Sequence, residues 1–393
     1  MSKVSAALPC ALLFFTSLTA VAQQQLWDET RGCFEAPQVM ETADGVEFVR
    51  TPPACFSNLP GFPYRLRTVE IDGLRQGFID EGPRDADPIL LLHGQPTWSY
   101  LYRKMIPFFL AAGHRVVAMD HVGLGNSDKP TDIAYYTYLG HTDRLEKFID
   151  ELDLQNITLF VQDWGSLIGL RVAGENTERF ARIVMGNGTL PVFPSRPGAP
   201  LQPPIPDPYR EDPDVPDLFL GSPEQQPFMP TEPNAEQIAV DQAYDKLGLQ
   251  DFARWQYYTL RSPKFRASKS VEAATYYDLP DAVEAAYDAP FPSRIYMAAI
   301  RAFPSLAPGM LLGVNDEAWE GLQNYQKPFL TIIGVRDTLP LGSEANQRRF
   351  IENVPGAAGQ SHVRLEEAAH FLQEDQGPDI ARRVVEFIEA NPR

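Results

Sequence analysis

Cysteine is scarce in this sequence, which has three cysteines among 393 residues. Cys10 lies in an apolar N-terminal stretch, and neither Cys33 nor Cys55 has the histidine neighbours that a zinc site or a catalytic thiol requires. Cysteine-based metal binding and catalysis are therefore excluded. In an oxidising compartment Cys33 and Cys55 would close a loop of about twenty residues, so we predict a disulfide between them, with two buried free thiols as the alternative.

Basic residues are also few, because 34 Lys and Arg stand against 52 Asp and Glu, for a formal net charge of −18. An acidic surface of this kind repels nucleic acid and anionic membranes, and we expect neither as a partner. After its first residues the chain has no uninterrupted apolar run near the length of roughly 18 residues that a membrane helix needs. We interpret the negative charge as a source of solubility.

The N-terminal segment, residues 1–22, is typical of a secretory signal. Lys3 supplies the positive charge, residues 6–19 the apolar stretch, and Ala20-Val21-Ala22 the small-residue cleavage site before Gln23. A membrane anchor is the alternative, but the apolar stretch is short for a span. We therefore predict a periplasmic or secreted protein in which residues 23–50 form an N-terminal extension.

Apolar runs of strand length recur along the rest of the chain. Residues 65–79 alternate apolar and polar side chains, as a half-buried strand or hairpin does. Five later runs have the apolar character of strands buried on both faces: residues 89–92, 116–119, 157–161, 183–185 and 329–333. Helical patterns such as residues 138–152 separate several of them. This alternation predicts the α/β class with a mostly parallel, doubly wound sheet.

The alternation stops after residue 188. The stretch from Pro191 to Pro233 contains 14 prolines, too many for a sheet interior or a long helix. Helical patterns follow at residues 236–260 and 270–286, and their many aromatic residues argue against a disordered linker. We predict a core made of residues 51–189 and 306–393, interrupted at residues 190–305 by a proline-rich excursion and a helical cap.

Asp163 ends an apolar run at the point where a helical pattern begins. The run at residues 157–161 leads to Asp163, and the helical pattern starts two residues later. This is typical of the strand-turn-helix elbow that presents a nucleophile at the edge of an α/β sheet. A serine there would attack acyl carbons, but Ser166 stands after the tip of the elbow. A carboxylate suits attack on an sp³ carbon with a leaving group, which would leave an alkyl ester for water to hydrolyse.

Two backbone amides near this elbow are candidate oxyanion donors. Gln95 lies in His93-Gly94-Gln95-Pro96, directly after a buried strand, where the loop supplies one donor for a developing oxyanion. The second donor would be the amide of Trp164, the residue after the nucleophile. An ordinary tight turn at residues 93–96 is the alternative.

An acid and a base complete the chemistry in chain order. Asp337 follows the strand at residues 329–333, and we predict it as the acid. The preceding strand ends near Asn187, which cannot ionise. His370 follows a short strand pattern at residues 363–365 and precedes the last helix, and we predict it as the base.

Neither a cofactor nor a metal is expected. The stretch from Gly123 to Pro130 contains two glycines in the manner of a dinucleotide loop, but it lacks the third glycine, and Pro130 prevents a helix from opening there. We interpret it as a structural loop. The sequence has no phosphate-binding loop and no cluster of residues with metal-ligand spacing.

Four segments resemble the haloalkane dehalogenases of the α/β-hydrolase fold. They are His93-Gly-Gln-Pro-Thr-Trp-Ser-Tyr-Leu-Tyr-Arg-Lys-Met-Ile-Pro107, Gly123-Leu-Gly-Asn-Ser-Asp-Lys-Pro130, Val161-Gln-Asp-Trp-Gly165 and Asp288-Ala-Pro-Phe-Pro292. The resemblance runs from residue 51 to the C-terminus and is greatest to the subfamily whose acid follows the later strand, which selects Asp337. It implies that Asp163 displaces halide from a small apolar substrate and that His370, oriented by Asp337, activates the water that cleaves the ester.

The resemblance also implies a halide site. Its donors would be the indole N–H of Trp164 and the side-chain amide of Gln95. The subfamily places a second halide-binding tryptophan in the cap, shortly before the segment at residues 288–292. Counting back reaches Thr275 and Tyr276, where no tryptophan stands, and we interpret Trp255, which lies well before them, as a core residue.

Two other functions fit part of the sequence. Epoxide hydrolases use the same Asp-His-acid chemistry with cap tyrosines that protonate the epoxide oxygen, and the candidates are Tyr257, Tyr258, Tyr276 and Tyr277. A secreted binding protein on an inactive scaffold is less favoured, because Asp163, Asp337 and His370 are all retained. The sequence does not indicate the oligomeric state.

Overall fold

A computed structural model of the chain describes residues 31–192, 210–218, 242, 252–310 and 313–393. The predicted signal at residues 1–22 and most of the proline-rich excursion lie outside these residues. So does most of the first predicted cap helix, of which the described part begins at Phe252.

The predicted α/β fold is confirmed by an eight-stranded sheet with the order β11-β10-β9-β8-β5-β6-β4-β3. Its strands are β3 (Arg67–Ile71), β4 (Leu74–Glu81), β5 (Pro88–Leu92), β6 (Arg115–Met119), β8 (Ile157–Val161), β9 (Phe180–Gly186), β10 (Phe329–Gly334) and β11 (Val363–Leu365). The β3–β4 hairpin is antiparallel and joins β6 antiparallel, whereas the other neighbours pair in parallel. The loops after β5, β8 and β10 therefore emerge at the same edge of the sheet.

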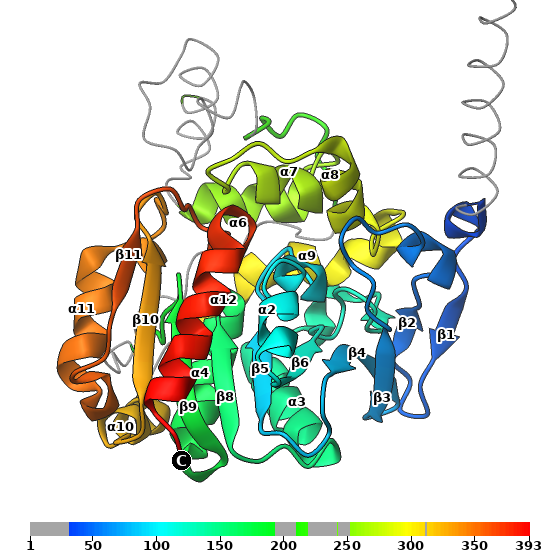
Figure 1. Cartoon of the computed structure of the whole chain (residues 1–393). Helices are drawn as coiled ribbons and strands as arrows, with labels where there is room; N and C mark the ends of the chain where they lie inside the picture. The colour runs from blue at the N-terminus through cyan, green and yellow to red at the C-terminus, as the bar shows by residue number, and fades with distance from the viewer. Residues whose placement is uncertain (1–30, 193–209, 219–241, 243–251, 311–312) are drawn as a thin grey trace, which may run out of the picture.

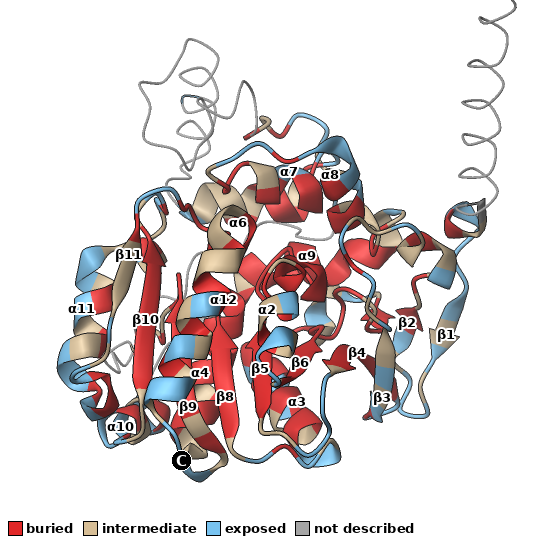
Figure 2. Cartoon of the chain, viewed as in Figure 1, coloured by how far each residue is buried: buried red, intermediate tan, exposed pale blue. Residues whose placement is uncertain are grey.

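Helices cover both faces of this sheet, and alternate strand residues explain the two layers. In β5, Leu90 and Leu92 pack in the cluster that contains Phe148 of helix α3 (Tyr138–Glu151), whereas Ile89 and Leu91 pack in the cluster that contains Phe109 of helix α2 (Ile106–Ala111). Successive side chains of a strand point to opposite faces, so a continuous apolar run is what a doubly covered strand requires. Figure 2 shows the central strands as the buried layer of the molecule.

The core helices are α2 (Ile106–Ala111), α3 (Tyr138–Glu151), α4 (Trp164–Glu175), α10 (Asp316–Gln323), α11 (Glu344–Asn353) and α12 (Leu372–Ala390). Helix α4 contacts α3 and α10 on one face of the sheet, and α12 contacts α2 on the other. The chain of α12 is kinked at Gln376, two residues before Pro378, which cannot donate a helical hydrogen bond.

The N-terminal extension is joined to the core more closely than its sequence indicates. Strands β1 (Val39–Glu41) and β2 (Glu47–Val49) form a small antiparallel sheet with β7 (Lys129–Pro130), in which β2 pairs with β7. The predicted disulfide is confirmed, since Cys33 and Cys55 are bonded with their Cα atoms 4.7 Å apart. Figure 1 shows this region at one side of the molecule, beyond β3.

The described part of the cap contains α6 (Phe252–Arg261), α7 (Ala267–Glu272), α8 (Asp281–Asp288) and α9 (Ala298–Ala302). The helical pattern at residues 270–286 is not one helix, because the chain leaves α7 after Glu272 and re-enters a helix after Pro280. Pro280 stands at the N-cap of α8, where its missing N–H costs nothing. In Figure 1, α6, α7 and α8 lie beyond the end of the sheet from which the catalytic loops emerge.

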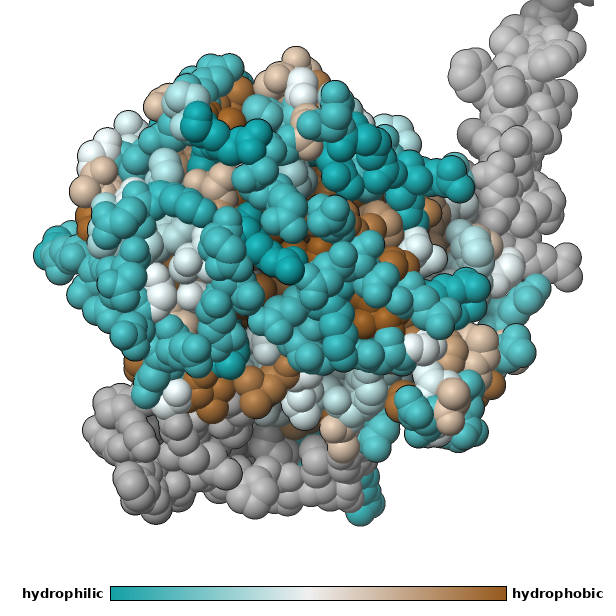
Figure 3. All heavy atoms as spheres, turned by 90° about the horizontal axis from the view of Figure 1, so that it is seen from below, coloured by the Kyte–Doolittle hydropathy of each residue, from teal (hydrophilic) through white to brown (hydrophobic). Residues whose placement is uncertain are grey.

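The face opposite the cap is shown in Figure 3, where hydrophilic residues cover most of the described surface. This agrees with the excess of 52 acidic over 34 basic side chains in the sequence. Among the described residues, no helix is long and apolar enough to cross a membrane.

Candidate active site

Asp163 stands at the turn between β8 and α4 in an unusual backbone conformation. Its φ is 50° and its ψ is −133°, a region that residues with a side chain seldom adopt. Close packing holds the turn, since a Cβ atom at Gly165 would lie 2.1 Å from the carbonyl oxygen of Leu92. The sharp turn leaves the Asp163 carboxylate facing the loop after β5, as a nucleophile elbow requires.

The loop after β5 contacts the Asp163 carboxylate directly. The Gln95 backbone N–H donates to Asp163 Oδ1 at 2.8 Å, which is the position predicted for an oxyanion donor. A Cβ atom at Gly94 would lie 2.0 Å from the same oxygen, so only glycine fits there. The Gln95 side chain donates from Nε2 to the carbonyl oxygen of Ile300 at 2.8 Å, which leaves one of its two N–H bonds for a ligand.

His370 lies between two carboxylates. Its Nδ1 is 3.0 Å from Asp337 Oδ2, and its Nε2 is 3.3 Å from Asp163 Oδ2. Asp337 follows β10 and is itself oriented by the Leu339 N–H, which donates to Asp337 Oδ1 at 2.9 Å. The structure thus brings together the three side chains that the sequence places in the order nucleophile, acid and base.

The two carboxylates determine the charge of His370. Burial alone lowers the pKa of this imidazole, but the negative charge of Asp337 and the hydrogen bond to Asp163 outweigh it and raise the pKa to about 10. The raised pKa keeps the ring an imidazolium at neutral pH. Loss of the Asp163 charge would remove part of this stabilisation.

Asn187 and Gln162 hold the backbone of His370, a role that the sequence does not reveal. Asn187 donates from Nδ2 to the carbonyl oxygens of Ala369 at 2.7 Å and His370 at 3.2 Å, and its Oδ1 accepts from the Gly334 N–H. Gln162 Nε2 donates to the His370 carbonyl oxygen at 3.1 Å and lies 3.2 Å from the ring Nε2. Asn187 therefore occupies the alternative acid position, where its hydrogen bonds link β9 and β10 to the turn that carries His370.

A pocket of about 50 Å³ lies beside the triad. Side chains from the core and the cap line it, and they include Gln95, Asp163, Trp164, Phe252, Trp255 and His370. Trp255, interpreted from the sequence as a core residue, does pack against the main hydrophobic cluster, but this half-buried side chain on α6 also lines the pocket of Asp163. Both tryptophans therefore border the space where a leaving group would be released.

Three of the four candidate tyrosines direct their hydroxyl groups to carboxylates elsewhere. Tyr258 donates to Asp217 at 3.1 Å, and Tyr277, which is exposed, donates to Glu367 at 2.9 Å. Tyr257 lies 3.4 Å from Asp212. The described residues that line the pocket of Asp163 include none of these tyrosines, nor Tyr276.

The other histidines near the site are part of the packing. His93 is fully buried, its Nδ1 lies 2.8 Å from the Gly94 carbonyl oxygen, and burial lowers its pKa to about 4. The His121 backbone N–H donates to His93 Nε2, which fixes the ring. The described part of the chain contains no group of three or more His, Cys, Asp or Glu side chains that could hold a metal ion.

Comparison with known proteins agrees with this geometry. A family model of the α/β hydrolase fold matches residues 87–217. A haloalkane dehalogenase of Mycobacterium marinum is 42% identical over 351 residues, which are 87% of this chain and 100% of the relative. A haloalkane dehalogenase of Psychrobacter cryohalolentis is 38% identical over 357 residues, which are 88% of this chain and 100% of the relative.

Solved structures of haloalkane dehalogenases share the fold of this chain. The tetrameric haloalkane dehalogenase DpaA from Paraglaciecola agarilytica NO2 superimposes with a TM-score of 0.65 and 29% sequence identity, and the match covers 86% of this chain and 97% of that chain. The haloalkane dehalogenase DbeA from Bradyrhizobium elkani has a TM-score of 0.61 at 22% identity, covers 83% of this chain and 98% of its own, and supports the fold alone.

Proposed function

Because this chain belongs to the haloalkane dehalogenase family and is a hydrolase of carbon–halogen bonds, we propose that Asp163, His370 and Asp337 carry out its reaction through an alkyl ester on Asp163. The substrate class is small apolar haloalkanes, and water is the second reactant. The observation that supports this assignment is the position of His370, 3.3 Å from the nucleophile and 3.0 Å from the acid.

In the first step an oxygen of Asp163 attacks the carbon that carries the halogen. Asp163 Oδ1 is held by the Gln95 N–H at 2.8 Å, which leaves Oδ2 as the nucleophile. A carbon–oxygen bond forms while the carbon–halogen bond breaks, and the halogen leaves with the electron pair as an anion. The product is a neutral alkyl ester of Asp163.

Two indoles are placed to receive the halide. Trp164 and Trp255 both line the pocket of Asp163, one from the start of α4 and the other from cap helix α6. An indole N–H is a donor without negative charge, which suits a developing halide. Trp255 thus provides the cap tryptophan that was missing near residues 275–276, and the remaining N–H of Gln95 can assist.

The second step depends on a change of charge at Asp163. Esterification removes one of the two negative charges beside His370, so the pKa of the imidazole falls, the Nε2 proton is lost to solvent and Nε2 becomes a base. Water then gives a proton to Nε2 as its oxygen bonds to the ester carbon of Asp163. The oxyanion that forms on Oδ1 accepts from the Gln95 N–H, and as this intermediate collapses the leaving oxygen takes the proton from His370 Nε2 and departs as the alcohol.

Halide release from brominated and chlorinated C2 to C6 alkanes, measured beside diol formation from a styrene-oxide-like epoxide, tests this function. We expect halide without diol. Diol without halide would contradict the assignment and support epoxide hydrolysis, although the hydroxyls of Tyr258 and Tyr277 donate to Asp217 and Glu367.

We also propose that the enzyme acts in the periplasm or outside the cell. The support is the signal pattern that ends at Ala22 together with the Cys33–Cys55 disulfide, a bond that persists in oxidising compartments. N-terminal sequencing of the exported protein should give Gln23 as its first residue. A protein recovered with an intact Lys3 segment would contradict the proposal.

A further inference from the structure

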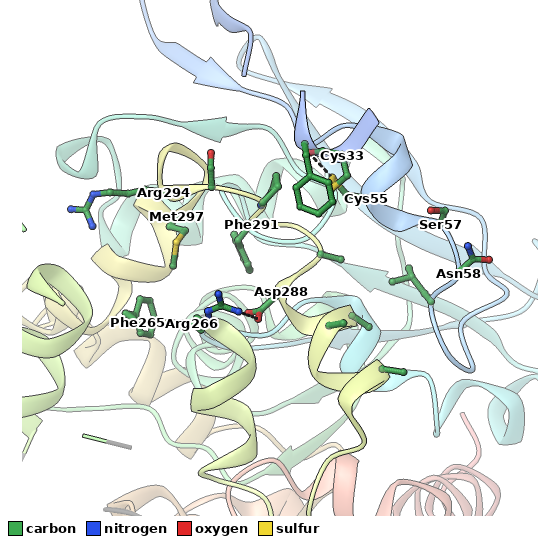
Figure 4. A pocket seen from close by; sticks show the side chains of 18 of the residues that line it. Cys33, Cys55, Ser57, Asn58, Phe265, Arg266, Asp288, Phe291, Arg294 and Met297 are labelled. Atoms are coloured by element: carbon green, nitrogen blue, oxygen red, sulfur yellow. Dashed lines mark hydrogen bonds and ion pairs between the residues drawn. A yellow bond between two sulfur atoms is a disulfide. The ribbon is translucent and has the colours of Figure 1, made fainter. Parts of the chain in front are cut away.

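A second pocket, here called the outer pocket, lies between the cap and the N-terminal extension. Its volume is about 670 Å³, far larger than the pocket of about 50 Å³ at Asp163. The disulfide region of Cys33 and Cys55 forms one wall, and the cap forms the other (Figure 4). A volume of this size is within the range of small-molecule sites, which is roughly 300 to 1,000 Å³.

The walls of the outer pocket are mostly apolar. Helix α8 contributes the small side chains of Ala282, Ala285 and Ala286, which leave space in front of the helix. Phe265, Phe291 and Met297 lie across this space, as Figure 4 shows. The lining therefore favours an apolar ligand.

The charged side chains of the outer pocket are paired with one another. Arg266 lies 3.8 Å from Asp288, and Figure 4 marks this pair. Arg294 forms an ion pair with Glu211, and Arg301 lies 3.8 Å from the same carboxylate. Since each cation has an acidic neighbour, the pocket has no strong preference for an anion, and a neutral ligand fits it best.

An aromatic contact joins a lining residue of the outer pocket to a lining residue of the catalytic pocket. Phe265 lines the outer pocket, and Trp255 lines the pocket of Asp163. Their rings meet edge to face with centroids 5.7 Å apart. Phe265 stands in the short connection between α6 and α7 and is a buried member of the main core cluster, where its ring also contacts Tyr258, so a substrate that passes between the pockets must displace this ring.

We infer that the outer pocket binds the neutral haloalkane first and that the substrate then passes Phe265 and Trp255 to reach Asp163. This inference rests on the proposed function, because it assigns a loading site to that reaction. Burial of the apolar chain between α8 and the disulfide region would concentrate a poorly soluble substrate next to the catalytic pocket.

The first test fills the outer pocket with a bulky side chain and measures the effect on kcat/KM. Ala285 is exposed on α8 and lines the pocket, so Ala285→Trp adds an indole there, whereas Ala345→Trp adds one to the exposed face of α11 as the matched control. With 1-bromobutane, we expect kcat/KM to fall about five-fold or more in Ala285→Trp only, with the rate of ester hydrolysis in a single turnover unchanged. A kcat/KM within about two-fold of the parent enzyme would overturn the inference.

A binding measurement separates this inference from the proposed function. Asp163→Ala cannot form the ester, and its crystals soaked in 1-bromobutane should show bromine anomalous scattering in the outer pocket, which Ala285→Trp should abolish. Bromine there, without halide release by the parent enzyme, would reject the proposed function but retain the binding site. Halide release by the parent enzyme, with no bromine between α8 and the disulfide region, would overturn the inference alone.

Discussion

His370 Nε2 lies 3.3 Å from Asp163 Oδ2, so the proposed base and the proposed nucleophile are in direct contact. In the proposed mechanism each group controls the other: the Asp163 carboxylate keeps His370 protonated, and esterification of Asp163 releases His370 as a base. In this mechanism one pair of side chains sets the order of the two chemical steps.

The pH dependence of stability should report this contact. The pKa of His370 is raised from 6.5 to about 10, so its contribution to stability is complete below pH 6.5 and is lost as the pH rises through 10. Asp163→Asn removes one of the charges, and we expect the melting temperature of this variant to decline less over that range. Burial lowers the pKa of Lys129 to about 7, and this group titrates in both proteins. The difference between the two curves of melting temperature against pH therefore isolates His370. Identical curves would contradict the coupling.

Asp337→Asn should slow hydrolysis of the alkyl-enzyme much more than its formation. The variant removes the charge 3.0 Å from His370 Nδ1, so the ring loses its orientation and its stabilisation as an imidazolium. By analogy with other triads we expect a decrease of about 10³-fold or more in the hydrolysis rate, measured by rapid quench. Equal effects on both steps would show that Asp337 does not act through His370.

Asn187→Asp should destabilise the fold and should not rescue Asp337→Asn. The substitution replaces an amide donor with a carboxylate facing the carbonyl oxygens of Ala369 and His370. We expect a loss of about 1 to 3 kcal/mol in the free energy of unfolding by urea. Asn353→Asp, on the exposed face of α11, is the matched control and should cost little. Rescue of activity in the double variant would show that position 187 can hold the acid.

Trp255→Phe should weaken halide binding. The change keeps an aromatic ring in the pocket but removes the N–H, and we expect about a ten-fold higher dissociation constant for bromide, corresponding to one lost charged hydrogen bond. Quenching of the remaining tryptophan fluorescence by bromide measures it. Trp319→Phe on α10, away from the pocket, is the control. Equal bromide affinity in both variants would leave Trp164 as the indole donor.

Local sequence signals account for the parts of the site that were predicted. Asp163 lies where an apolar strand meets a helix, and this boundary is visible within ten residues of sequence. Asp337 and His370 follow from chain order and strand ends. The disulfide could also be predicted from the sequence. Cys10 lies in the predicted signal, which leaves Cys33 and Cys55 as the pair that an oxidising compartment would join.

The features that the sequence did not predict depend on contacts between segments that are far apart in the chain, or on elements too short to give a pattern. Trp255 was not assigned to the halide site because it lies well before the positions reached by counting back from residues 288–292, yet α6 carries it to the pocket of Asp163. The hydrogen bond from Asn187 to the His370 turn spans 183 positions of sequence, and the one from Gln162 spans 208 positions. No local sequence pattern indicates either of them. Strands β1 and β2 are three residues each, too short for a periodic signal.

The central claim is that Asp163 forms an ester which His370 hydrolyses, and intact-mass measurement of His370→Gln after exposure to 1-bromobutane tests it most directly. The variant keeps Asp163 and its Gln95 donor but removes the base. We expect bromide release of one equivalent and a protein heavier by one butyl group, whereas Asp163→Ala should gain no mass. A His370→Gln protein of unchanged mass that still releases bromide in multiple turnovers would contradict the covalent mechanism.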